Sequence, residues 1–331
     1  MVLGGAATAR PLMPRAQQAA GNRRVGVLLL LSRPGNDALP TDIATFQQEL
    51  ERLGWQRGRN LYIDYGWAGS ADVLPMSVDE RLRITAADLL ALAPDVVLAV
   101  GTPPTAARQR LTSTVPVVFT VVSDPVAQGF VPSLAHPGGN MTGISNLEPT
   151  VGAKWLELLK QIAPRVTHVA VVINQKAFPL SVEFFRSAEA AASKFMVQAV
   201  MAPVHDTDEI EAIMATLGGR SDAGAIFPVD PFTTLHSKFI LAQVARHRLP
   251  AIFGFRGFAD GGALSTYGAD QADVHRKAAV YVDRILRGEK PSDLPVQQPT
   301  KFELVINLKT ARALGLDVPQ ILLSIANEVI E

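Results

Sequence analysis

Residues 96–122 read VVLAVGTPPTAARQRLTSTVPVVFTVV. Two apolar runs, Val96–Val100 and Val115–Val122, flank a stretch that we interpret as a helix. Because the runs are continuously apolar rather than alternating, they are typical of strands buried on both faces of a parallel sheet. This stretch therefore predicts a strand, a helix and a second parallel strand joined by a right-handed crossover.

The same pattern recurs along the chain. Further strand-like runs are Val25–Leu31, Leu61–Trp67, Val169–Ile173, Phe195–Met201, Ala223–Phe227, Ala251–Phe253, Leu264–Tyr267 and Phe302–Asn307. Helical stripes separate them, such as Ile43, Phe46, Leu50 and Leu53, or Trp155, Leu158, Leu159 and Ile162. The alternation predicts an α/β fold of two Rossmann-like lobes, each a parallel sheet flanked by helices.

The division into lobes follows from the turn residues between the strands. Turn residues at 136–140 precede Met141–Asn146, which we interpret as an extended segment that crosses between lobes. We expect residues 24–145 and 267–293 to form the first lobe, and residues 146–266 and 294–331 to form the second. A hinge of several strands would join them.

The composition excludes several classes of protein. The 331 residues are 48% hydrophobic, and 31 basic residues balance 31 acidic ones, so neither disorder nor a nucleic-acid partner is expected. The absence of cysteine excludes disulfides, thiol nucleophiles and a lipid attached to an N-terminal cysteine. The six histidines lack metal-ligand spacing, and no nucleotide-binding or protease motif is present. We therefore expect no cofactor, no metal and no catalytic residue.

The N-terminal segment, residues 1–23, has two interpretations. Met1–Gln18 is rich in small residues and resembles the second half of a secretory signal that lacks its charged start. The alternative is a flexible tail. We expect one or the other.

Candidate binding residues follow the predicted strands, where ligands bind in open parallel sheets. Three sites place a capping residue directly before proline: Thr102 before Pro103, Asp124 (preceded by Ser123) before Pro125, and Asp230 before Pro231. Such residues can simply start helices, or they can contact a ligand. In the second case Thr102 and Ser123 would donate to a carboxylate, and Asp230 would accept from an amine or hydroxyl.

The remaining candidates occupy equivalent positions. They are Ser32, Asn174, Phe232, Arg256 and Tyr267. Aromatic rings can stack on a planar ligand and Arg256 can bind a carboxylate, although core packing and surface ion pairs are the alternative roles.

Several motifs carry a family resemblance that spans Arg24 to Glu331. They are PVVF at 116–119, SDPV at 123–126, HPGGNMTG at 136–143, GGALSTYG at 261–268 and the tail at 288–311. With these motifs the chain resembles the bacterial ABC-transporter substrate-binding proteins of the tryptophan-binding-protein-like family, which have a periplasmic binding protein type 1 fold. Gly254 departs from the resemblance, since an acidic or polar residue is expected there.

The resemblance implies a receptor rather than an enzyme. It implies a periplasmic receptor that captures a small solute between hinged lobes and delivers it to an inner-membrane ABC permease. We further expect a monomer and, from the absence of cysteine, no lipid anchor. Thr102, Ser123 and Asp124 would line the first lobe's side of the cleft, and Asn174 and Asp230 the second. The aromatic and Ser/Thr/Asp content of this cleft favours an amino acid or an aromatic carboxylate.

Two other functions remain open from the sequence. One is a two-lobed α/β enzyme that uses carboxylates such as Asp124 and Asp230 across the cleft. The other is a LacI-like sensor, although the 23 residues before Arg24 are too few for a helix-turn-helix domain.

Overall fold

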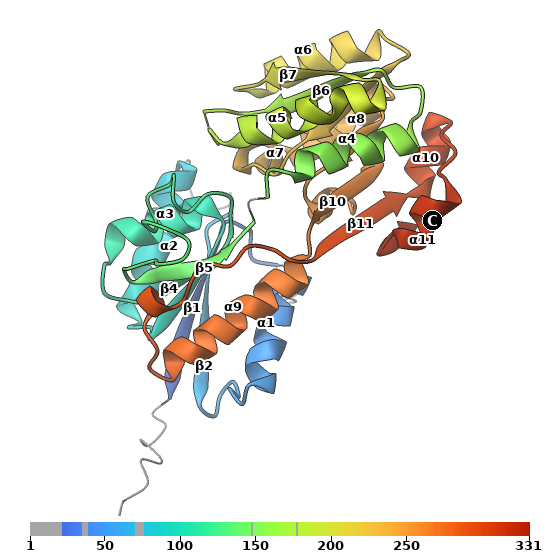
Figure 1. Cartoon of the computed structure of the whole chain (residues 1–331). Coiled ribbons are helices and arrows are strands. Elements are labelled where there is room, and N and C mark those ends of the chain that lie inside the picture. The colour runs from blue at the N-terminus through green and yellow to red at the C-terminus, as the bar shows by residue number, and fades with distance from the viewer. Residues whose placement is uncertain (1–21, 35–38, 70–75, 147, 177) are drawn as a thin grey trace, which may run out of the picture.

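The computed structural model describes residues 22–34, 39–69, 76–146, 148–176 and 178–331. The chain forms two α/β lobes, each built on its own sheet, with connecting segments between them (Figure 1). The tail at 1–21 lies outside the described residues. Within the described part of the chain, no helix is both long and apolar enough to cross a membrane.

The first lobe contains a five-stranded parallel sheet in the order β2-β1-β3-β4-β5. The strands are β1 Arg23–Leu29, β2 Leu61–Trp67, β3 Val96–Val100, β4 Val117–Val122 and β5 Met141–Ser145. The helices are α1 Thr41–Arg52, α2 Val78–Ala91, α3 Thr102–Leu111 and α9 Gln271–Leu286.

Both faces of this sheet are covered. Val27 packs in one cluster with Phe46 of α1 and Ala278 of α9, whereas Leu28 packs in another with Leu82 of α2 and Ala107 of α3. Adjacent residues of β1 thus bury opposite faces, which explains why the strand is apolar without alternation.

The second lobe contains a seven-stranded sheet in the order β12-β11-β10-β9-β8-β6-β7. The strands are β6 His168–Ile173, β7 Gln198–Pro203, β8 Ala223–Phe227, β9 Ala251–Phe253, β10 Ser265–Ala269, β11 Phe302–Asn307 and β12 Glu328–Ile330. The helices are α4 Val151–Ile162, α5 Ser181–Ala192, α6 Thr207–Gly218, α7 Pro231–Leu235, α8 Ser237–Arg246, α10 Leu308–Leu314 and α11 Gln320–Ile325. Only the β10–β11 pair is antiparallel among the described strands.

The predicted α/β architecture of two helix-flanked lobes is confirmed, but two segments differ from expectation. Met141–Ser145 is not a crossing segment: it is the fifth strand of the first sheet and is buried throughout. The segment predicted as Phe195–Met201 starts later, at Gln198, because Phe195 ends a short 3₁₀ helix and Met196 has a left-handed backbone (φ 54°).

Three segments cross between the lobes. The first runs from Ser145 of β5 to Val151 of α4, the second joins β10 directly to α9, and the third precedes β11. The third segment is tied to the first sheet, because Gln297 accepts from the Ser145 amide (2.8 Å) and donates to Gly143 O (3.0 Å).

These contacts place two crossings a few residues away from the expected lobe boundaries at 266/267 and 293/294. Tyr267 pairs with Leu304 inside the second sheet, so the chain leaves that lobe after Ala269. Leu294 and Val296 are buried in clusters of the first lobe, so the return follows Gln297.

Candidate functional site

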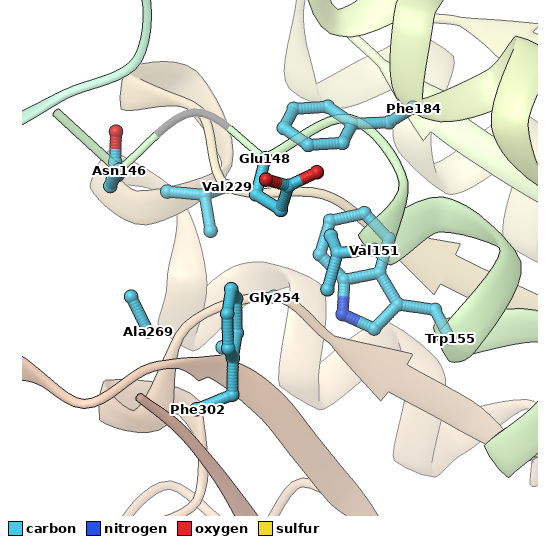
Figure 2. Close-up of a pocket in the computed structure, with 10 residues that line it drawn as sticks. Asn146, Glu148, Val151, Trp155, Phe184, Val229, Gly254, Ala269 and Phe302 are labelled. Carbon is cyan, nitrogen blue, oxygen red and sulfur yellow. The ribbon is translucent and has the colours of Figure 1, made fainter. Parts of the chain in front are cut away.

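A small cavity of about 20 Å³ lies where the first two crossings enter the second lobe (Figure 2). Such a volume corresponds to about one water molecule. Asn146 and Glu148 of the first crossing line it together with Gly268 and Ala269 at the end of β10. The second lobe contributes the remaining lining residues, which are Val151, Trp155, Phe184, Val229, Gly254 and Phe302.

Trp155 is the most firmly held residue of this cavity. It belongs to the apolar stripe of α4 and is 1% exposed. Its indole Nε1 donates to the carbonyl of Tyr267 on β10 (2.6 Å), and its ring lies 5.1 Å from that of Phe184 on α5. Because both the polar and the apolar parts of the side chain have partners, the indole offers a fixed aromatic wall.

A second aromatic pair lies on the neighbouring strands. The Phe302 ring of β11, which lines the cavity, stacks on Tyr267 of β10 at 5.7 Å. Tyr267 therefore contributes to the site through its backbone and through Phe302, and its own side chain is not among the lining residues.

Gly254 and Gly268 allow the backbone to approach this aromatic wall closely. A Cβ atom on Gly254 would lie 2.7 Å from Trp155 Cζ2 and 2.9 Å from the Val229 amide nitrogen. A Cβ atom on Gly268 would lie 2.2 Å from Gly254 O. The acidic or polar side chain expected at position 254 therefore has no room, and the glycine is a requirement of packing.

Two side chains at this cavity carry hydrogen-bond acceptors. Asn146 Oδ1 is buried and has no partner among the described residues. One oxygen of Glu148 accepts from Thr150 Oγ1 (2.6 Å), and no described Lys, Arg or His pairs with this carboxylate.

Asp230 adds a buried carboxylate one residue beyond Val229. It is 1% exposed and is the N-cap of α7, where Oδ1 accepts from the Thr233 amide (2.8 Å). Its Oδ2 has no partner among the described residues. Burial raises the pKa of Asp230 to about 6, although hydrogen bonds from Thr233 and Phe232 oppose this shift.

None of the sequence-predicted candidates of the second lobe lines the cavity, Asp230 included. Asn174 is buried in the turn after β6, and Phe232 is half-buried with its ring 4.7 Å from that of His236. Arg256 is already engaged, since its guanidinium bridges Asp260 (2.8 Å) and Glu328 (2.5 Å). Its expected role as a carboxylate ligand would require breaking these ion pairs.

The first-lobe candidates lie at the carboxyl ends of their strands, but none lines the cavity. Thr102 and Pro103 form the first turn of α3, whose N-cap is Gly101 rather than Thr102. Ser123 is 7% exposed, and Asp124 Oδ1 accepts from the amides of Val126 and Ala127. Ser32 is exposed after β1.

Of the three capping sites expected before proline, only Asp230 therefore caps a helix with its side chain. Asp124 begins a series of turns instead of a helix. Gly101 caps α3 with φ at 97°, which leaves the Thr102 side chain without a capping role.

Sequence reasoning missed most residues that line the cavity. The apolar pattern predicts only a helical stripe at Trp155. No motif of the sequence points to Asn146, Glu148, Phe184 or Phe302 as a lining residue. The signal available was the position of Asn146 and Glu148 beside a predicted crossing. No group of three or more His, Cys, Asp or Glu in the described ranges is arranged to hold a metal.

Two α/β lobes joined by three crossings are the architecture of type 1 periplasmic binding proteins. The model of the family "ABC transporter substrate binding protein" matches residues 24–330, and the chain belongs to this family. Members of the family are substrate-binding proteins and not enzymes.

Individual relatives are similar over most of their length. The chain is 26% identical to the "Tyrosine-binding protein" of Clostridioides difficile (strain R20291) over 294 residues, which is 89% of this chain and 81% of that protein. A Streptococcus pneumonia ABC domain in complex with L-Trp has a TM-score of 0.79 at 24% identity, covering 94% of this chain and 100% of that one. A ligand-free, open substrate-binding protein with adhesive properties from Clostridium difficile has a TM-score of 0.69 at 26% identity, covering 93% and 99%.

Proposed function

We propose that this substrate-binding protein captures an amino acid or an aromatic carboxylate beside its hinge and delivers it to an inner-membrane ABC permease. The family implies a small solute and an ABC permease as partners. The proposal adds the class of solute, the place of capture and the direction of transport.

The aromatic cavity carries this proposal. Trp155, Phe184 and Phe302 present ring surfaces to one space, and the ring of Trp155 is fixed by its hydrogen bond to Tyr267 O. The space holds about one water molecule in this structure, so a planar apolar group enters only when the lining residues move apart, and its burial against these rings then gains hydrophobic and stacking energy. The names of two similar proteins, one tyrosine-binding and one bound to L-Trp, support the same class.

The position of the cavity suggests how capture changes the shape of the molecule. Two of the three crossings provide lining residues, so a bound solute contacts the segments that must bend when the lobes approach each other. A solute that also reaches Thr102 and Ser123 of the first lobe would stabilise a closed arrangement by its greater affinity for it. In this arrangement the hydroxyl groups of Thr102 and Ser123 would donate to a carboxylate.

The same proposal covers location and assembly. We infer that the protein acts in the periplasm as a monomer. The absence of cysteine from the 331 residues supports a monomer, because no disulfide between two copies can form.

A thermal-shift panel tests the function. Amino acids, aromatic carboxylates and sugars are added to the purified full chain, and a solute at ~100 times its Kd stabilises the fold by about 2.7 kcal/mol. We expect aromatic members to raise Tm and sugars to leave it unchanged. A rise with sugars alone, or no rise with any member, would contradict the proposal.

A further inference from the structure

We propose that the solute carries a protonated amine, and that Glu148 and Asn146 on the first crossing bind this amine. The inference rests on the proposed function and narrows it: the protein would take aromatic amines and amino acids and reject aromatic carboxylates that lack an amine.

The first crossing brings two polar side chains to the cavity. Asn146 and Glu148 both line the cavity, and they are separated by a single residue. Asn146 Oδ1 is a buried acceptor without a donor among the described residues. Because an unsatisfied buried acceptor costs about 1–3 kcal/mol, a ligand with N–H donors gains that energy when it binds.

The charge of Glu148 favours a cationic group on the solute. Glu148 has no cationic partner in the described part of the chain, and among the described residues its carboxylate accepts hydrogen bonds from Thr150 alone. The carboxylate points toward the space between Phe184 and Val151 (Figure 2). A solute carboxylate placed there would be repelled, whereas an ammonium group would form a charge-assisted hydrogen bond.

The aromatic rings of the cavity also favour a cationic group. An ammonium group close to the faces of Trp155, Phe184 or Phe302 is also attracted by the ring quadrupoles. The acceptors of Asn146 and Glu148 thus share this space with three aromatic rings, and neither an arginine nor a lysine contributes to its lining.

Three compounds with the same ring separate the alternatives. L-Tryptophan has an amine and a carboxylate, tryptamine has only the amine, and indole-3-propionate has only the carboxylate; tyrosine, tyramine and 3-(4-hydroxyphenyl)propionate form a matched phenol series. Isothermal titration calorimetry on the full chain at pH 7.5 measures each Kd. We expect the amine-only compounds to bind within about tenfold of the amino acid, and the carboxylate-only compounds to bind at least a hundredfold more weakly.

The variant Glu148→Gln removes the charge and keeps the shape. We expect it to weaken binding of the amine-bearing compounds at least tenfold, whereas Glu80→Gln, in an exposed ion pair with Arg83 on α2, leaves every Kd unchanged. Circular dichroism melts verify that both variants fold. Tight binding of the carboxylate-only compounds, or unchanged amine affinity in Glu148→Gln, would overturn the inference and leave the receptor function intact. No binding in either series would overturn both.

Discussion

At the scale of single residues, Asp230 combines a structural role with a possible site of recognition. One carboxylate oxygen caps α7, and the other has no donor among the described residues. The sequence predicts the cap, because Asp before Pro is a typical helix start. It does not predict the orphan oxygen, since that depends on which atoms of distant segments surround it.

Replacing Asp230 by asparagine keeps a good capping residue and removes the charge. The pKa of Asp230 is about 6 in the folded state, against 3.8 for the unperturbed group. Above pH 3.8 the unfolded state ionises first, so the wild-type protein loses stability as the pH rises to about 6 and regains none above it. A difference of about two pH units corresponds to about 3 kcal/mol.

We therefore expect Asp230→Asn to gain stability over wild type as the pH rises. The difference between their free energies of unfolding should be larger at pH 7.5 than at pH 3.5 by up to about 3 kcal/mol. Urea unfolding at both pH values provides the measurement. Asp206→Asn, which makes the same substitution at the exposed N-cap of α6, is the matched control for the loss of a capping carboxylate. A gain for Asp230→Asn that does not vary with pH would contradict the explanation.

At the scale of elements, β11 brings an acidic residue to the hinge. Glu303 lies opposite Gly268 of β10, next to Phe302 of the cavity, and it has no ion pair or hydrogen bond of its own among the described side chains. Burial, followed by the charge of Asp270, raises the pKa of Glu303 to about 7, while Arg256 opposes and Glu328 adds to the shift.

Glu303→Gln should therefore stabilise the protein in a pH-dependent manner. The wild-type protein loses stability as the pH rises from 4.5 to about 7, because the unfolded state ionises before the folded state does. Since the side chain is only half-buried, solvent screening reduces the effect to about 1 kcal/mol. We expect Glu303→Gln to unfold at higher urea concentration than wild type at pH 8 but at the same concentration at pH 4.5. Equal urea midpoints of the two proteins at pH 8 would show that the ionised Glu303 carboxylate does not destabilise the folded state.

The elements differ in how well the sequence predicts them. Strands such as β3 and β6 are buried on both faces and are recognisable as continuous apolar runs. The fifth strand, β5, contains Thr142, Gly143 and Ser145, and its burial follows from tertiary contacts instead: a Cβ on Gly143 would lie 2.1 Å from Phe119 O. The cavity was missed for a similar reason, because it unites a crossing with two helices and two strands that are distant in sequence.

At the scale of the whole molecule, solute capture should make the protein more compact. A compact chain of this length has a radius of gyration of about 20 Å. Small-angle scattering of the free protein should give a larger value, and saturation with L-tryptophan should move it toward 20 Å. Glu148→Gln at the same concentration should stay at the free value. Calorimetric binding by the wild-type protein without any change in radius would contradict closure.

The interleaving of the two lobes also has a consequence for biosynthesis. The core of the first lobe requires α9 and Leu294, which follow the strands of the first sheet by more than a hundred residues. A nascent chain emerging from the ribosome therefore cannot complete its first lobe until almost the entire second lobe has been synthesised. Both lobes should reach their final form together, late in translation, and truncation before α9 should leave one face of the first sheet with α1 but without α9.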